Sequence, residues 1–337
     1  MKQNKQIIFG IIAAFVVGVI VVLSLCAYAV YVPTNSRART ATMVVVKPGS
    51  SINDIAQTLR QKKLVSSAFA FTVYARLSGK GERLIPGTYA LKASMNIPEI
   101  ITYLASGKVA ARKVVIPEGY TVTKIAQLWK TLGFGSPEEF MTAARKQYDY
   151  AFLPTPSSSV PYQVEGYLFP ATYQVVINAS PESFIRQMLT TFQQRALPSL
   201  SAGLGEQNQL KTPQDIVTLA SLVELEANDA ENRAKVAGVF LNRLARGMAL
   251  ESDVTVIYAT GNTNITAADL RSSSPYNTRL KSGMPPGPIC SPSLEAINAV
   301  LNPTKSDFIF FLAGNDGQVY YAKTLSEHNQ NIARYLK

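Results

Sequence analysis

Two carboxylates stand in an otherwise apolar stretch of the chain, where acid–base chemistry is possible. The stretch is LASLVELEAND, residues 219–229, and the acids are Glu224 and Glu226. On a helix that turns 100° per residue, they fall on opposite flanks of an apolar stripe that includes Leu219 and Val223. The two acids therefore cannot face each other, and at most one of them can point into a given cleft.

Glu224 is the better candidate for chemistry, because its neighbours Leu222, Val223 and Leu225 are apolar. A carboxyl group that apolar neighbours partly desolvate can stay protonated near neutral pH. A general acid needs this property in order to protonate a glycosidic oxygen. The alternative is a glutamate that is solvated or paired with an arginine, for which Arg233, Arg243 and Arg246 are available; this is common for an acid that flanks a core stripe.

The elements that must position these acids are marked by their first and last residues. TPQD, residues 212–215, has an N-cap, then a proline, then an acid at the third helical position, which predicts the start of a helix. Asn228 with Glu231 predicts the start of the next helix, which should end near residues 246–247. DFIFFLA and QVYYAKT, separated by GNDG, predict a hairpin, and a short helix should follow from Ser326. Helices and strands do not alternate regularly, so the predicted fold class is α+β.

The first part of the chain has the pattern of a membrane anchor. Residues 7–31 contain no charged residue and are long enough to span a bilayer as a helix. Lys2 and Lys5, the basic residues in residues 1–6, favour a cytoplasmic tail, with everything after a linker at residues 32–42 outside the cytoplasm. A cleaved signal peptide is the alternative, because Ala27-Tyr28-Ala29 has a small-x-small pattern. We favour an uncleaved single-pass helix, since the apolar stretch is longer than that of a usual signal peptide.

An internal repeat divides the remainder. VKPGSSINDIAQTL, residues 46–59, aligns with IPEGYTVTKIAQLW, residues 116–129. Each copy predicts the end of a strand, a glycine turn and a helix; in the first copy, Ser51 and Asp54 form a plausible capping box. We expect residues 43–110 to form a small α/β module, and the second copy to open a larger domain at residues 111–337.

Composition and short motifs exclude several classes of function. The chain has 337 residues, 47% of them hydrophobic and 16% charged, which is ordinary for a globular protein of two or three domains. Its net charge of +11 suits anionic partners such as lipid or a wall polymer, but the basic residues are too scattered to predict a nucleic-acid site.

The two cysteines, Cys26 and Cys290, predict neither a disulfide nor a zinc site. No S-x-x-K or G-x-S-x-G motif predicts a serine enzyme, and no cofactor or metal is expected.

Six blocks resemble the MltG (YceG-like) family of endolytic murein transglycosylases. They are EGYLFPATY, LASLVELEA, VFLNRLARGMALESDVTVIYA, PYNT, GMPPGPI and SEHN. They follow one another in the order typical of that family, and together with the anchor and the small module the resemblance covers nearly the whole chain. One departure is Asp253-Val254-Thr255, where the family usually has Asp-Pro-Thr.

The resemblance implies a reaction. Members of the family cleave the β-1,4 bond between N-acetylmuramic acid and N-acetylglucosamine within nascent glycan strands, which terminates strand elongation. The muramoyl 6-hydroxyl closes onto C1, so no water is consumed and a 1,6-anhydro end forms. The catalytic glutamate of the family matches Glu224, which would act first as acid and then as base. An internal hydroxyl replaces the second carboxylate of an ordinary glycosidase.

The resemblance also implies residues that contact the glycan. These candidates are Glu165, Tyr167, Asn242, Asp253, Thr255, Tyr276, Asn277 and Thr278. Glu165 is interpreted as a sugar-positioning acid or as part of a structural ion pair, and Glu226 as a helix-surface or supporting residue.

Residues 43–110 look LysM-like, and could bind glycan or act as a spacer. The expected partners are peptidoglycan strands, the inner membrane and peptidoglycan synthases, with the catalytic domain in the periplasm. A membrane-tethered scaffold that binds peptidoglycan without catalysis is the alternative.

Overall fold

The computed structural model describes residues 2–203 and 210–336, with side chains described over residues 15–201 and 210–336. Within this part, helices occur together with three two-stranded sheets, so the predicted α+β class is confirmed. The chain forms two compact units. The first comprises residues 1–112 and 174–178, and the second comprises residues 113–173 and 179–337.

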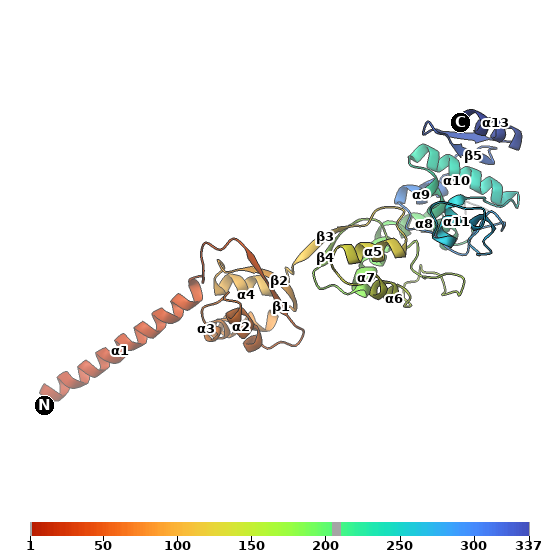
Figure 1. The fold of residues 1–337 in the computed structure, drawn as a ribbon. Coiled ribbons are helices and arrows are strands. Elements are labelled where there is room, and N and C mark those ends of the chain that lie inside the picture. Colours follow the sequence, from red (N-terminus) through yellow and green to blue (C-terminus); the bar gives the residue numbers. More distant parts are fainter. Residues whose placement is uncertain (1, 204–209, 337) are drawn as a thin grey trace. The chain divides into compact units, whose positions relative to one another are not determined.

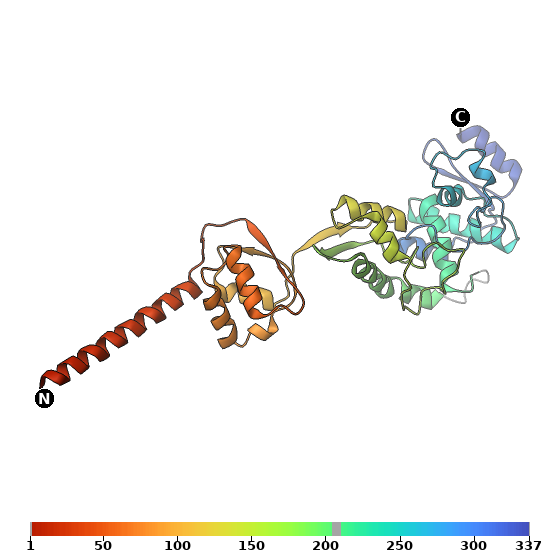
Figure 2. The same cartoon turned by 60° about the horizontal axis from the view of Figure 1, so that its bottom comes forward.

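The first unit is built on an antiparallel hairpin. Strands β1 (Ala41–Val46) and β2 (Gly87–Lys92) pair so that Val44 lies opposite Tyr89, and both side chains are fully buried. Three helices gather beside this hairpin (Figures 1 and 2): α2 (Ile52–Gln61), α3 (Ala68–Leu77) and α4 (Ile97–Ala105). A short 3-10 helix, Gly81–Arg83, precedes β2. The predicted capping box of Ser51 and Asp54 at the start of α2 is confirmed.

Helix α1 (Lys2–Tyr31) contains the segment predicted to span a membrane, residues 7–31. Over the residues that the structure describes, no helix combines the length and the apolarity that a bilayer crossing needs. The predicted tail, residues 1–6, and the first part of the predicted span, residues 7–14, lie outside the part with described side chains.

The rest of the chain is mainly helical. Strands β3 (Ala111–Val115) and β4 (Thr172–Val176) pair with each other, as do β5 (Phe310–Ala313) and β6 (Val319–Ala322). The helices are α5 (Val122–Thr131), α6 (Pro137–Ala144), α7 (Pro181–Arg195), α8 (Leu197–Gly203), α9 (Pro213–Glu226), α10 (Ala230–Ala245), α11 (Asp253–Thr260), the 3-10 helix Asp269–Arg271, α12 (Leu294–Leu301) and α13 (Leu325–Tyr335).

Helices α9, α10 and α12 pack against one another and form the centre of the second unit. Figures 1 and 2 show α10 between α9 and the C-terminal hairpin, which α13 accompanies. Helix α9 is buried continuously from Ile216 to Glu224, so it is a core helix and has no broad solvent face. Its predicted start is confirmed, because Thr212 and Asp215 form a capping box with Pro213 in the first turn.

Two predicted helix starts are displaced by a residue. Helix α10 is capped by Asp229 and not by Asn228, because the Asp229 carboxylate accepts a hydrogen bond from the backbone N–H of Asn232. Helix α13 is capped by Thr324 and begins at Leu325, one residue before the predicted Ser326. The predicted C-terminal hairpin is confirmed, with Phe310 opposite Ala322.

The internal repeat is confirmed as a repeated local structure. A strand is followed by a glycine with positive φ, +79° at Gly49 and +71° at Gly119. A hydroxyl-capped helix comes next, with Ser51 before α2 and Thr121 before α5. Glycine suits both turns because it adopts positive φ without the strain that a Cβ atom introduces.

Candidate active site

Glu224 lies near the C-terminal end of α9 and is only 8% exposed. Its Oε1 atom is 2.9 Å from Nη2 of Arg233. Its Oε2 atom accepts hydrogen bonds from the backbone N–H and the hydroxyl of Ser293, at 2.8 and 2.5 Å. Every one of these partners is a donor, which is the arrangement that suits a carboxylate. The environment of Glu224 is therefore decided by two other helices and not by its apolar neighbours along α9.

Ser293 links Glu224 to the start of α12. It is the N-cap of that helix, and its hydroxyl oxygen accepts a hydrogen bond from the backbone N–H of Ala296 at 3.0 Å. The same hydroxyl donates to Glu224, so a single side chain caps the helix and positions the acid. The N-terminal end of a helix carries partial positive charge, which adds to the stabilisation of the carboxylate.

Arg233, from the first turns of α10, connects the buried acid with the surface. Its Nη1 atom is 2.6 Å from a carboxylate oxygen of Glu295, whose side chain is 70% exposed. The Arg233 side chain itself is only 7% exposed. The guanidinium therefore bridges one buried and one exposed carboxylate.

The turn of the second repeat approaches Glu224 from another direction. The backbone N–H of Gly119 donates to the carbonyl of Ser291 at 2.9 Å, and the Tyr120 carbonyl accepts from the Ser291 N–H at 2.8 Å. A Cβ atom built on Gly119 would lie 3.9 Å from Cγ of Glu224. The turn is thus fastened to the segment that leads into α12, and it passes directly beside the candidate acid.

Glu118, which precedes Gly119, is a site residue that the sequence interpretation missed. It is exposed as a residue, but partial burial of its carboxyl group raises the pKa of that group. The negative charge of Glu224 raises this pKa further, while Arg233 opposes the shift. A signal was available in the repeat, because the first copy has Pro48 at the matching position, just before its glycine.

Glu165 is buried, with 2% exposure, and caps the helix that follows this turn. Its Oε1 atom accepts from the backbone N–H of Val122, the first residue of α5, at 3.0 Å. Its Oε2 atom accepts from the hydroxyl of Tyr258 at 3.2 Å. Burial raises the pKa of Glu165 to about 7, against the lowering effect of these hydrogen bonds. Its contact with a sugar stays a prediction.

Most of the other predicted glycan contacts lie inside the protein. The ring of Tyr167 is fully buried against Phe152 and Phe192, and Tyr276 is 3% exposed beside Tyr258. Three further candidates make hydrogen bonds inside the protein. Thr255 and Thr278 are joined through their hydroxyls at 2.9 Å, and Asn277 donates to the carbonyls of Leu270 and Ser272. The structure therefore brings Thr255 and Thr278 together, but not against Glu224.

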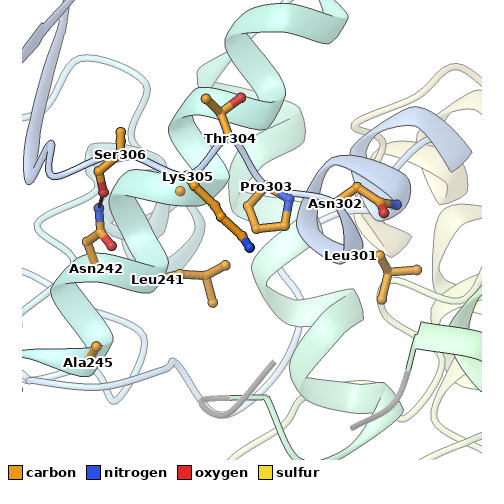
Figure 3. Close-up of a pocket in the computed structure, with 10 residues that line it drawn as sticks. Leu241, Asn242, Ala245, Leu301, Asn302, Pro303, Thr304, Lys305 and Ser306 are labelled. Atoms are coloured by element: carbon orange, nitrogen blue, oxygen red, sulfur yellow. Dashed lines mark hydrogen bonds between the residues drawn. The ribbon is translucent and has the colours of Figure 1, made fainter. Parts of the chain in front are cut away.

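Asn242 and Asp253 line two cavities whose linings do not include Glu224. Asn242 lines a cavity of about 520 Å³ and points toward Ser306, donating to its carbonyl at 2.7 Å (Figure 3). Asp253 pairs with Arg279 at 2.9 Å beside a cavity of about 310 Å³.

Glu226 lines the same cavity as Asp253 and accepts from the Ser252 hydroxyl at 2.6 Å. Burial raises the pKa of Glu226, and the charge of Asp253 adds to the effect. Since Glu224 contacts α10 and α12 instead, the prediction that the two acids of the motif do not face each other is confirmed. Within the described part of the chain, no group of His, Cys, Asp and Glu side chains is arranged to hold a metal ion.

The buried Glu224 thus lies where α9, α10, α12 and the Gly119 turn meet. Comparison with known proteins shows which family the chain belongs to. The chain belongs to the YceG-like family, whose model matches residues 44–334. It is 33% identical to an endolytic murein transglycosylase of Streptococcus pneumoniae strain D39, over 96% of this chain and 66% of the relative. It therefore spans slightly less than two thirds of the length of that relative.

Two further comparisons agree with this family. An endolytic murein transglycosylase of Bacillus subtilis strain 168 is 30% identical, over 90% of this chain and 87% of the relative. The crystal structure of a YceG-like protein from Listeria monocytogenes matches with a TM-score of 0.60 and 33% identity, over 86% of this chain and 98% of that one.

The raised pKa of Glu165 predicts a pH-dependent stability. A carboxyl group with a folded pKa of about 7 and an ordinary value of 4.5 contributes stability that is complete below pH 4.5 and lost as the pH rises through 7. This difference corresponds to roughly 3 kcal/mol. Wild type should therefore lose about that much unfolding free energy between pH 5 and pH 8 relative to Glu165→Gln, as measured by denaturant unfolding.

The control for this measurement is Glu138→Gln, because Glu138 is exposed in the first turn of α6. The same measurement on this variant shows the effect of removing an exposed carboxyl group. An equal pH dependence in wild type and Glu165→Gln would contradict the interpretation of Glu165 as a buried titrating cap.

The Glu224–Arg233 pair predicts a strong thermodynamic coupling. Replacing Arg233 with Met leaves a buried carboxylate without its cation, which should cost about 3–5 kcal/mol of unfolding free energy. Adding Glu224→Gln should restore part of this loss, with a coupling of about 2 kcal/mol in a double-mutant cycle. Lys235→Met on the same helix breaks a partly exposed pair with Glu231 and should cost less than about 0.5 kcal/mol. Additive effects of the two changes at 224 and 233 would contradict the pairing.

Proposed function

We propose that this chain is a peptidoglycan lytic transglycosylase that cleaves glycan strands internally. The observation that carries the proposal is Glu224, a buried carboxylate held by Arg233 and Ser293 beside a surface turn. Relatives named endolytic murein transglycosylases match over at least 90% of this chain, and they support the reaction class.

The proposed reaction cleaves the β-1,4 bond between N-acetylmuramic acid and N-acetylglucosamine. The muramoyl 6-hydroxyl attacks C1, the bond from C1 to the leaving oxygen breaks, and a 1,6-anhydro end remains. The attacking hydroxyl belongs to the sugar that is cleaved, so its effective concentration is high and no water has to be activated. Glu224 is the proposed acid/base, and a fixed carboxylate within reach of the 6-hydroxyl can accept its proton.

The finer parts of the function are also proposals. Residues 43–110 would serve as a LysM-like module that binds glycan or holds the catalytic domain at a distance from the membrane. Cleavage of nascent strands would terminate their elongation close to peptidoglycan synthases. The acetamido sugars would be recognised by polar residues of the motif blocks, among which Glu165 is the best candidate for a supporting role because it holds the helix after the Gly119 turn.

We also propose that residues 7–31 anchor the chain in the inner membrane, with the catalytic domain in the periplasm. Residues 7–31 carry no charge. Large apolar side chains of α1 are exposed, among them Phe15, Leu23 and Leu25 at 72, 62 and 63%. An exposed apolar helix of this kind gains free energy when hydrocarbon replaces water around it.

The reaction predicts a diagnostic product. Wild-type protein incubated with purified glycan strands should produce new 1,6-anhydromuramic ends, detected by mass spectrometry, and Glu224→Gln should produce at least about 100-fold fewer. Glu226→Gln is the matched control, since Glu226 lies on the same helix but faces another cavity, and it should keep forming anhydro ends. Reducing ends in place of anhydro ends would indicate hydrolysis, and glycan binding without cleavage would favour a scaffold.

The anchor predicts membrane association that depends on the apolar surface of α1. The full chain should float with phospholipid vesicles in a density gradient, whereas a variant with Ile20 and Leu23 replaced by Asp should remain in the dense fraction. Leu325→Asp, a change at an exposed apolar residue of α13, is the control and should leave flotation unchanged. Equal flotation of the Asp variant and wild type would overturn the assignment of the anchor.

A further inference from the structure

Most of the excess positive charge of the chain belongs to the first unit. Residues 32–112 contain twelve Lys and Arg residues and three Asp and Glu residues, so their net charge is +9, out of +11 for the whole chain. Residues 113–337 contain nineteen residues of each sign and carry no net charge. Charge that is confined to one small module suits an anionic surface that this module contacts, such as the headgroups of anionic lipid.

In the part of the chain with described side chains, helix α3 keeps one apolar face exposed. Phe69, Val73 and Leu77 follow one another at intervals of four residues, and their exposed fractions are 73, 37 and 83%. Residues four apart are neighbours on the same side of a helix, so these three side chains form one stripe. The opposite side of α3, with Phe71 and Ala75, is buried in the core of the first unit.

The end of the proposed anchor helix packs against the same helix. The rings of Tyr31, in the last turn of α1, and Tyr74, in α3, lie 6.3 Å apart in an edge-to-face arrangement. The hydroxyl of Ser66, just before α3, donates to the carbonyl of Ala29 at 3.4 Å. Figures 1 and 2 show α1 ending directly at the helices of the first unit. A bilayer that encloses α1 therefore reaches the level of α3.

The apolar stripe borders the side of α3 that contacts α1. On a helix that turns 100° per residue, Leu77 lies about 60° around the helix from Tyr74. The end of α1 also exposes aromatic side chains, with Tyr28 at 65% and Tyr31 at 58%. Tyrosines are enriched where a membrane helix passes the headgroups. The stripe thus lies beside the level at which the proposed anchor leaves the hydrocarbon.

Basic side chains flank the stripe. The hydroxyl of Thr34, in the linker after α1, donates to the carbonyl of Lys63 at 2.9 Å. This bond keeps the exposed Lys62 and Lys63 near the end of α1. Arg76 is exposed in the last turn of α3, next to the stripe. An apolar face with basic residues around it is typical of a helix that lies at the surface of an anionic membrane.

We propose that the α3 face formed by Phe69, Val73 and Leu77 docks on the lipid surface from which α1 emerges. This inference rests on the proposed membrane anchor and adds a second contact with lipid to it. The occupant of the face is lipid and not another protein, because the stripe borders the anchor and the charge of the module complements anionic headgroups. The first unit is then held at two places, by α1 in the hydrocarbon and by α3 among the headgroups.

The test uses the full chain in vesicles of equal amounts of phosphatidylcholine and phosphatidylglycerol, with one fluorescent label in each variant. The label is attached to the cysteine of Phe69→Cys or Leu77→Cys, in both cases with Cys26→Ser to remove the exposed native thiol. Cys290 is fully buried and stays unlabelled. Lipids with a quencher just below the headgroup should reduce the fluorescence of both labels at least about twofold, because an interfacial helix buries its apolar face roughly 5–10 Å deep.

Two further variants make the test specific for this face. Val45→Cys is the matched control, because Val45 is 51% exposed on the side of β1 that points away from the core, and its label should not be quenched. Adding Leu77→Asp to Phe69→Cys should weaken the quenching at residue 69, because a charge in the stripe resists burial in lipid. Equal quenching at residues 45, 69 and 77 would overturn docking by the α3 face.

A label on the native Cys26, which lies in α1, separates the remaining outcomes. Quenching at Cys26 without quenching at residues 69 and 77 would overturn the docking of α3 and leave the anchor in place. If the label on Cys26 is not quenched either, the proposed anchor fails, and this inference fails with it. A label at residue 77 that is shielded from a water-soluble quencher, yet not reached by quenchers in lipid, would show that a protein such as a second copy of this chain covers the stripe. That result would also overturn the proposal.

Discussion

The buried ion pair of Glu224 and Arg233 is the interaction on which the rest of the site depends. Removing a carboxylate from water is costly, and the cost is offset only where a cation and hydrogen-bond donors meet it with good geometry. Here the cation comes from α10 and the donors come from the start of α12. The relative placement of α9, α10 and α12 therefore both satisfies this acid and is constrained by it.

A second consequence concerns the turn that precedes α5. The turn reaches the acid because Gly119 adopts positive φ and because its backbone, with that of Tyr120, bonds to Ser291. Glu165 is buried and accepts a hydrogen bond from the first backbone N–H of α5. Burial raises the pKa of its carboxyl group to about 7. Two glutamates thus serve the same turn in different ways. Glu165 is a structural cap inside the protein, and Glu118 presents its carboxyl group at the surface.

The structure gives several polar residues of the motif blocks a role in holding a buried segment. Thr255 and Thr278 bond to each other through their hydroxyls, and Asn277 donates to the backbone carbonyls of Leu270 and Ser272. Buried hydroxyl and amide groups must find such partners, because an unpaired polar group inside a protein is costly. Their residue types suit contacts with acetamido sugars, but the same types are also what a buried loop needs to hold its shape.

The sequence by itself determined the features that rest on local geometry. The start of α9 at Thr212 follows from its capping residues, and the divergence of Glu224 from Glu226 follows from helical periodicity. The repeated strand, glycine turn and capped helix are likewise local patterns. The start of α10 shows where sequence-based prediction of helix ends stops. Asn228 and Asp229 are both good N-caps, and only the folded backbone selects Asp229.

Only the tertiary structure decided which groups surround the acid. Ser293 is 69 residues from Glu224 along the chain, and Glu295 is 62 residues from Arg233, so no periodicity relates them. Tertiary packing also separated Asn242 and Asp253 into other cavities and enclosed Tyr167 in the core, although all three lie in motif blocks of the same family as the block that holds the catalytic candidate. The physical reason is that a motif specifies residue types along the chain, whereas burial and ion pairing depend on which distant segments the core brings together.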